Sequence, residues 1–215
     1  MVNLTLTELD PLTATQSKIR RADILTPLQE AEAAINALGS LAAGELASDA
    51  AQIDLTGIPQ TGSIFDLYLR LRATPAVTSV NLQVGINGDG TAAHFNNLSY
   101  DIASGGIQNL DTNAANYAYM KCLIGAPAGS APSGLWANWH IRIFDYADAT
   151  AEYKNILGDG LMMRALSATN MHRMIIAGNW SSGTTDPITQ VTITPGSGNW
   201  LAGSRYAYRL LGAAA

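Results

Sequence analysis

The histidines that could do chemistry are spread along the chain and do not gather in a motif. The three residues are His94, His140 and His172, and none has a second histidine, a cysteine or a close carboxylate at the spacing of a metal-ligand pair. The patterns H-E-x-x-H, C-x-x-C and G-x-S-x-G and the P-loop are absent from the sequence. We therefore expect structural imidazoles and a chain that is not an enzyme, with no catalytic residue, metal or cofactor.

The tripeptide Gly-Asp-Gly occurs twice, at residues 88–90 and 158–160, and raises the question of a phosphate or calcium loop. Neither copy extends to G-x-G-x-x-G. The oxygen ligands near the first copy are Asn87, Asp89 and Asn96, with one carboxylate among them, whereas an EF-hand loop needs several. Both copies are predicted to be turns.

Glycoside hydrolysis needs two carboxylates that face one cleft. The candidates are Asp66, Asp89, Asp101, Asp145 and Asp148, which lie in different turns and strand ends. The sequence leaves open whether any two of them converge on one cleft. A carbohydrate-active hydrolase of the tailspike kind is therefore kept as an alternative.

Aromatic residues form a more suggestive set, because they lie near strand ends or opposite the apolar faces of predicted strands. Flat rings bury much area at low entropic cost, which suits contact with a partner or a sugar. The residues assigned to a candidate partner or glycan surface are Tyr117, Tyr119, Trp136, Tyr206 and Tyr208. Packing at the core edge or between subunits is the alternative for these rings.

The composition excludes several classes of function. The 215 residues carry a net charge of −5, and no basic run exists beyond Arg20-Arg21, so we expect no nucleic-acid binding. No apolar run approaches the roughly 18 residues of a membrane span, and the start does not resemble a signal peptide. We expect folding in a cytoplasm without membrane insertion. The single cysteine, Cys122, is predicted to be buried.

The elements that must position these side chains change character near residue 45. Before it, the chain is rich in helix-forming Ala, Leu, Gln and Glu. A start signal at Thr26 and a stop signal at Gly39 predict a helix over about 27–38. One face of this helix carries Leu28, Ala31, Ile35 and Leu38. It could form a short coiled-coil seam or pack on the main domain.

Over residues 46–215 the hydrophobic period changes to two. The alternating stretches are 63–72, 78–87, 116–125, 135–146, 171–180, 187–194 and 204–212. Turn-forming Gly, Pro and Asn residues separate them. Many short half-buried strands of this kind predict a mainly β fold, an antiparallel, jelly-roll-like β-sandwich preceded by a short helical arm.

The last strand signals flank a glycine-rich loop, "ITQVTITPGSGNWLAGSRYAYRLLG", at residues 188–212. We expect a closing hairpin in which Val191 and Ile193 face the core and "PGSGN" makes the turn. The final strand would then complete the sandwich, so the C-terminus would belong to the fold.

Several segments, in chain order, resemble virion structural proteins of tailed bacteriophages and phage-like particles, which carry a C-terminal jelly-roll-like β-sandwich. The segments are "LTGIPQTGSIFDLYLRLR", "VGINGDGTAAHF", "IRIFDYADATAEYKNILGDG" and "GNWSSGTTDPITQVTITPGSGNWLAGSRYAYRLLG". They cover about residues 53–212. The chain departs from the family pattern where "YRLLG" replaces L-Y-G and where "HFNN" replaces Asn-Tyr-Ser.

The resemblance implies a surface-exposed fibre, spike or receptor-binding module on a phage tail or head. Residues 1–45 would anchor the β domain to the particle, with Leu28, Ile35 and Leu38 as the docking side chains. It further implies a homo-oligomer, a trimer as in related appendages, with other virion proteins and host surface polysaccharide as partners. A capsid decoration or cement protein, or a free lectin-like module, is the alternative.

Overall fold

The computed structural model describes residues 42–103, 106–111, 118–165, 171–183 and 185–212, and of residues 106–111 the backbone alone. The helix predicted over 27–38 lies outside these residues, as do the docking side chains Leu28, Ile35 and Leu38. Apart from one short 3-10 helix, η1 (Ala92–His94), the regular secondary structure of the described part is β-strand.

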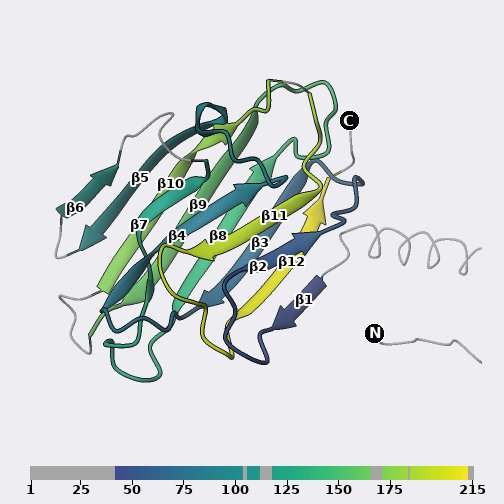
Figure 1. Ribbon diagram of the computed structural model, residues 1–215. Coiled ribbons are helices and arrows are strands. Elements are labelled where there is room, and N and C mark those ends of the chain that lie inside the picture. The colour runs from purple at the N-terminus through teal and green to yellow at the C-terminus, as the bar shows by residue number, and fades with distance from the viewer. Residues whose placement is uncertain (1–41, 104–105, 112–117, 166–170, 184, 213–215) are drawn as a thin grey trace, which may run out of the picture. The chain divides into compact units, whose positions relative to one another are not determined.

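Two antiparallel sheets form a β-sandwich (Figure 1), which confirms the predicted mainly β fold. The larger sheet has the order β1 (Ala42–Glu45), β12 (Arg205–Leu211), β3 (Ile64–Leu71), β8 (Ala137–Phe144), β9 (Lys154–Met163), β10 (Met171–Trp180), β5 (Phe95–Ala103) and β6 (Gly106–Asp111). The smaller sheet has the order β2 (Ile53–Thr56), β11 (Gln190–Pro195), β4 (Ser79–Ile86) and β7 (Met120–Pro127).

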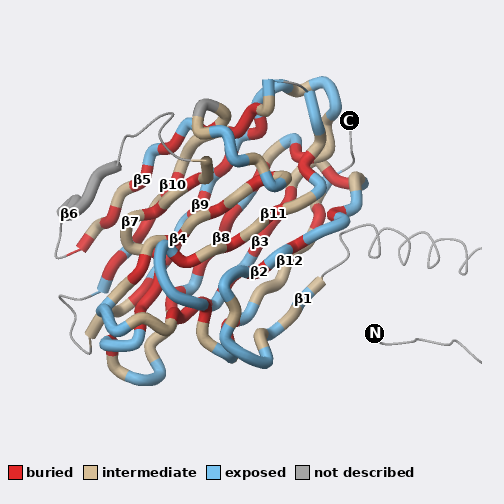
Figure 2. The backbone as a smooth tube through the Cα atoms, viewed as in Figure 1, coloured by how far each residue is buried: buried red, intermediate tan, exposed pale blue. Residues whose placement is uncertain are grey.

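The hydrophobic core fills the space between the sheets. Buried and more exposed residues alternate along the strands (Figure 2), as expected when successive side chains of a strand point to opposite faces. The inward residues of β3 are Phe65, Leu67, Leu69 and Leu71, and those of β8 are Ala137, Trp139, Ile141 and Ile143. Cys122 is buried in the same core, as predicted.

The chain repeatedly crosses from one sheet to the other. Strands β1, β3, β8 and β12 belong to the larger sheet, and β2, β4, β7 and β11 belong to the smaller one. Two antiparallel pairs, β5 with β6 and β9 with β10, interrupt this alternation and widen the larger sheet. The smaller sheet therefore has half as many strands as the larger one.

The predicted closing hairpin is wrong, although Val191 and Ile193 do face the core. β11 pairs with β2 and β4, whereas β12 pairs with β1 and β3. The connection between them is held by Trp200, which is buried and donates its indole N–H to the carbonyl oxygen of Ile193 at 2.8 Å. This anchor in the core allows the chain to change sheets after β11.

The two Gly-Asp-Gly sequences differ in structure. Residues 88–90 follow β4 in a turn, as predicted, with left-handed φ angles of 50° at Asn87 and 66° at Gly88. Residues 158–160 were also predicted to be a turn, and this is wrong because β9 runs straight through them. A Cβ at Gly160 would collide with the indole ring of Trp139, so glycine makes room there for a large core side chain.

Deleting residues 200–215 should prevent the chain from folding. The deletion removes Trp200 from the core and takes out β12, which lies between β1 and β3 in the larger sheet. We expect no soluble protein with a cooperative thermal unfolding transition. Deletion of 213–215 alone is the control and should leave that transition in place. A folded, cooperative domain after the longer deletion would contradict the role assigned to β12.

Candidate functional site on the outer face of the larger sheet

The two sheets present very different outer faces to their surroundings. On the smaller sheet this face carries hydrogen-bonded polar residues, such as Thr192 with Asp54 and Thr194 with Gln83. The outer face of the larger sheet is unusual because it exposes large apolar side chains, whereas antiparallel sheets commonly turn a polar face to water. Of the seven large apolar side chains that the described residues expose, five lie on it: Tyr68, Leu98, Leu157, Leu161 and Met171.

A buried carboxylate organises the half of this face that β12, β3 and β8 form. Asp66 lies on the outer side of β3, yet its side chain is 0% exposed. The register places it between Arg209 on β12 and Arg142 on β8. Both arginines reach the carboxylate through Nε, Arg209 at 2.8 Å and Arg142 at 3.1 Å. Tyr68 donates its hydroxyl to Asp66 at 2.8 Å, and His140 contacts the same carboxylate through Nε2.

These contacts keep Asp66 ionised. Burial by itself raises the pKa of a carboxyl group, but hydrogen bonds from His140, Arg209, Tyr68 and Arg142 outweigh it and hold the pKa of Asp66 well below its ordinary value. Burial, and after it the hydrogen bond to the same carboxylate, raises the pKa of Tyr68. Arg209 is also raised in pKa, chiefly by its hydrogen bond to Asp66. The cluster therefore holds one negative charge beneath two permanent positive charges.

The side chains around Asp66 also stack on one another. The rings of Tyr68 and His140 are nearly parallel, with centroids 4.5 Å apart. The guanidinium of Arg209 lies over the Tyr68 ring at 5.6 Å and donates to its hydroxyl through Nη2 at 2.9 Å. Packing and hydrogen bonding together fix these side chains in one arrangement.

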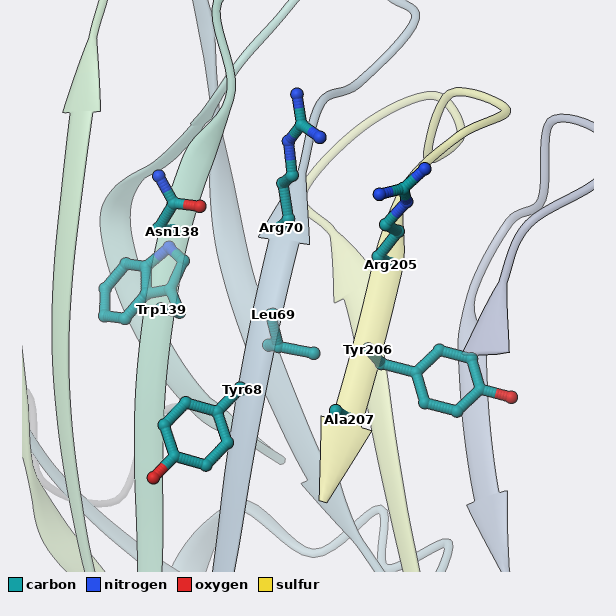
Figure 3. A pocket seen from close by; sticks show the side chains of 8 residues that line it. All are labelled: Tyr68, Leu69, Arg70, Asn138, Trp139, Arg205, Tyr206 and Ala207. Atoms are coloured by element: carbon teal, nitrogen blue, oxygen red, sulfur yellow. The ribbon is translucent and has the colours of Figure 1, made fainter. Parts of the chain in front are cut away.

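A second row of donors lies on the same strands, two residues beyond Tyr68 and His140. The register aligns Arg205 on β12, Arg70 on β3 and Asn138 on β8. Figure 3 shows the three side chains extending toward the same end of the strands. Arg205 donates through Nε to Glu45 at 2.7 Å, and the guanidinium of Arg70 lies 4.7 Å from the ring of Trp136.

The loop that carries Trp136 is held by an arginine that the sequence analysis did not single out. Arg72 is buried and donates to the carbonyl oxygens of Ala131 and Pro132, each at 2.8 Å, and of Leu135 at 3.0 Å. A buried charge needs several hydrogen bonds to replace water, and this loop supplies them. Arg72 thereby fixes the segment that positions Trp136 beside Arg70.

Two shallow depressions indent this face. The first has a volume of about 260 Å³ and lies among Tyr68, Arg70, Asn138, Arg205 and Ala207, above the strand positions of Leu69, Trp139 and Tyr206 (Figure 3). The second has a volume of about 350 Å³ and is lined by His140, Arg142, Leu157, Gly158, Asp159, Ile175 and Ile176. The stacked pair of Tyr68 and His140 stands between them, since each depression includes one of these two rings.

The aromatic residues assigned from sequence are placed differently from one another. Tyr206 pairs with Leu69 and Tyr208 with Leu67, so both tyrosines turn toward the core, and the outward side chains of β12 are arginines and Ala207. Trp136 is half-buried at the edge of the outer face. Tyr119 is half-buried just before β7, and Tyr117 lies outside the described residues.

The remaining polar candidates are committed to structural contacts. Asp89 accepts from His94 at 2.7 Å and from the Trp180 indole at 2.8 Å, which together with a backbone N–H lower its pKa against the effect of burial. Asp101 and His172 form a buried pair on the inner side of the sheet. Asp66 and Asp101 therefore face opposite sides of the larger sheet and flank no common cleft.

The oxygen atoms considered for calcium are used within the fold. Asn87 accepts from the backbone N–H groups of Thr189 at 2.8 Å and Gln190 at 3.0 Å, and Asn96 donates to Asn179. Asp145 and Asp148 lie in the turn that follows β8. Among the described residues, no three His, Cys, Asp or Glu side chains form a group that could hold a metal ion.

Comparisons of the chain with models of protein families, with curated proteins and with solved structures find no match. In the part of the chain that the structure describes, no helix is long and apolar enough to cross a membrane. What the outer face of the larger sheet can bind follows from its own charges and shape.

Replacing Asp66 by Asn should destabilise the protein by about 2 to 3 kcal/mol at pH 7, because it removes a buried charge that accepts several charged hydrogen bonds. The low pKa of Asp66 contributes stability that is present above the ordinary value of 3.8 and is lost as the pH falls below it. The difference in the free energy of unfolding between wild type and Asp66→Asn should therefore be smaller at pH 3 than at pH 7. Denaturant unfolding at both pH values measures this difference.

The matched control is Asp159→Asn, which breaks an ion pair with Arg173 on the same face. Both partners of that pair are at least half exposed, so its loss should cost less than about 1 kcal/mol. Equal effects of the two substitutions at pH 7 would contradict the organising role of Asp66.

Proposed function

We propose that this chain is a non-enzymatic virion structural protein, of the fibre, spike or receptor-binding kind, and that the larger sheet is its assembly surface. The observation that carries the proposal is the apolar half of the outer face, formed by β9, β10 and β5. Its exposed side chains are Leu98, Leu157, Leu161 and Met171, joined by the half-buried Ile102 and Ile175. Contiguous exposed apolar surface of this kind marks a contact surface.

The topology supports the proposal. The sheet orders β1-β12-β3-β8 and β2-β11-β4-β7, with the chain alternating between them, support our proposal that these eight strands form a jelly-roll framework. Jelly rolls occur in viral capsid and lectin domains, although a fold by itself does not define a function. The strand pairs β5–β6 and β9–β10 are then additions to that framework. Three of these four added strands, β5, β9 and β10, form the apolar half.

A second copy of the chain is the occupant that we propose for the apolar half. Its charged groups on β9, β10 and β5 are Asp159 and Arg173, which pair with each other. This half is therefore electrically neutral and can face a like surface without repulsion between like charges. Cyclic homo-oligomers bury such surfaces around a symmetry axis, and a trimer is the arrangement that we expect. Residues 1–41 would anchor the assembly to the particle, because residues 42–45, which the sequence analysis assigned to the arm, form β1 of the larger sheet.

Introducing lysines at Leu157 and Leu161 should disrupt this assembly. Each lysine would place a charge in the centre of an apolar contact, and we expect the subunits to associate at least roughly a hundredfold more weakly. Sedimentation over a range of concentrations measures the change. The matched control is Val77→Lys with Tyr153→Lys, the two exposed large apolar residues that lie away from this face.

The control protein should associate like the wild type. A wild-type chain that stays monomeric at about 100 µM, where even a weak complex forms, would contradict the assembly proposal. A Leu157→Lys/Leu161→Lys variant that associates normally would contradict it as well.

Removal of the whole protein from particles tests the proposed location. Loss of host adsorption with an intact shell is expected for a fibre, spike or receptor-binding module. Loss of resistance to heat or osmotic shock with normal adsorption would contradict that role and assign the chain to capsid decoration.

A further inference from the structure

Two like charges stand directly opposite each other on the outer face of the larger sheet. Arg70 on β3 and Arg205 on β12 are register partners, and both side chains are exposed. Like charges in such cross-strand positions destabilise a sheet. Arg205 has Glu45 as its partner, whereas Arg70 has the ring of Trp136 and no carboxylate among the described residues. Two guanidinium groups thus share one acid, an arrangement that an added anion would stabilise.

The first depression brings further donors to the same place. Asn138 continues the row next to Arg70, and Tyr68 borders the depression on the adjacent row. Ala207 is the small residue between Arg205 and Arg209 on the outward side of β12, and it leaves the space open. A carboxylate, sulfate or phosphate group placed there meets planar guanidinium forks, which bind such oxyanions in a bidentate manner.

The second depression lies diagonally across the strands from the first. It is centred near β9, two strands from β3 and about two residues away along the strands, so the centres are roughly 12 Å apart at the usual strand dimensions. Arg142 lines this second depression. In the part of the chain that the structure describes, Nε is the only guanidinium nitrogen of Arg142 that contacts Asp66. Two subsites in a row, separated by the edges of Tyr68 and His140, suit a chain of repeating units better than a single small molecule.

The charge of this half distinguishes it from the apolar half. We define the arginine half by Arg70, Arg142, Arg205 and Arg209, and the last three of these pair with the carboxylates of Asp66 and Glu45. Four guanidinium groups and two carboxylates leave a surplus of two positive charges, although the whole chain carries −5. This half therefore repels its own copy and attracts an anionic ligand.

We propose that the arginine half of the outer face binds an acidic polysaccharide, a linear polymer of sugar rings that bear carboxylate groups. Protein partners need a buried apolar centre in the contact, and Tyr68, at 36%, is the only large apolar side chain that the described strands of the arginine half expose. Shallow depressions with a mostly apolar lining and forked donors beside it suit sugar rings, which combine apolar ring faces with hydroxyl and acid groups. Asp66 is a positioning residue, because it holds Arg142 and Arg209 from below. The first depression lies wholly within the arginine half and does not depend on the assembly proposed for the apolar half, whereas the second depression shares Leu157, Asp159 and Ile175 with the apolar half.

Calorimetric titration of the full chain with polygalacturonate tests the proposal. We expect saturable binding that weakens as salt rises, because the contacts are ionic. Arg70→Gln and Arg205→Gln should each weaken it roughly tenfold, the value of one lost charged hydrogen bond. The control is Lys121→Gln, which removes the same charge from the outer side of the smaller sheet, on β7, and should bind like the wild type.

Two further polymers separate sugar recognition from charge alone. Methyl-esterified polygalacturonate keeps the sugar backbone without the charge and should not bind. Polyglutamate keeps the carboxylates without the sugar and should bind at least tenfold more weakly. Equal affinity for polyglutamate would overturn the saccharide proposal in favour of an acidic peptide. Normal binding by Arg70→Gln and Arg205→Gln variants that unfold at the wild-type temperature would overturn the location, and no binding of any polymer would overturn both.

Discussion

A charge that is removed from water must find partners, and Asp66 imposes this constraint on the larger sheet. Its carboxylate is buried on the side of the sheet that faces away from the core, so its donors have to come from the outward side chains of its own strand and of the two neighbouring strands. Arg142, Arg209, Tyr68 and His140 supply them and become fixed above it. The sequence marks Asp66 only as one acid among several, because the strand register that brings its partners together is set by the whole sheet.

The larger sheet has more strands than the smaller one, and its outer face is the surface that we propose for binding. The smaller sheet turns polar side chains outward, whereas the larger sheet combines an arginine half on the framework strands with an apolar half on the added strands. Electrostatics separates their roles. The apolar half is neutral and can meet its own copy, while the arginine half carries excess positive charge and requires an anion. In the arrangement that we propose, one sheet holds subunits together and leaves the first depression open for a ligand.

Apolar alternation predicted the strands whose inward residues are hydrophobic, such as β3, β4, β8 and β11, and it failed where that rule is broken. β5 turns Asn97, Ser99 and Asp101 inward, so its pattern does not look half-buried. β9 was divided by an expected turn because Gly158 and Gly160 resemble turn residues, yet they sit in the strand where Trp139 and other core side chains need space. Both failures reflect packing between strands that are distant in the sequence.

Hydroxyl-radical footprinting of the native assembly tests most directly whether the outer face of the larger sheet is an interface. The chain carries its own controls, since Val77 and Tyr153 are exposed to a similar degree but lie elsewhere. We predict that Leu157, Leu161 and Met171 react less in the concentrated assembly than in the dilute monomer, while Val77 and Tyr153 react equally in both. Equal reactivity of all five residues in the two states would contradict the account.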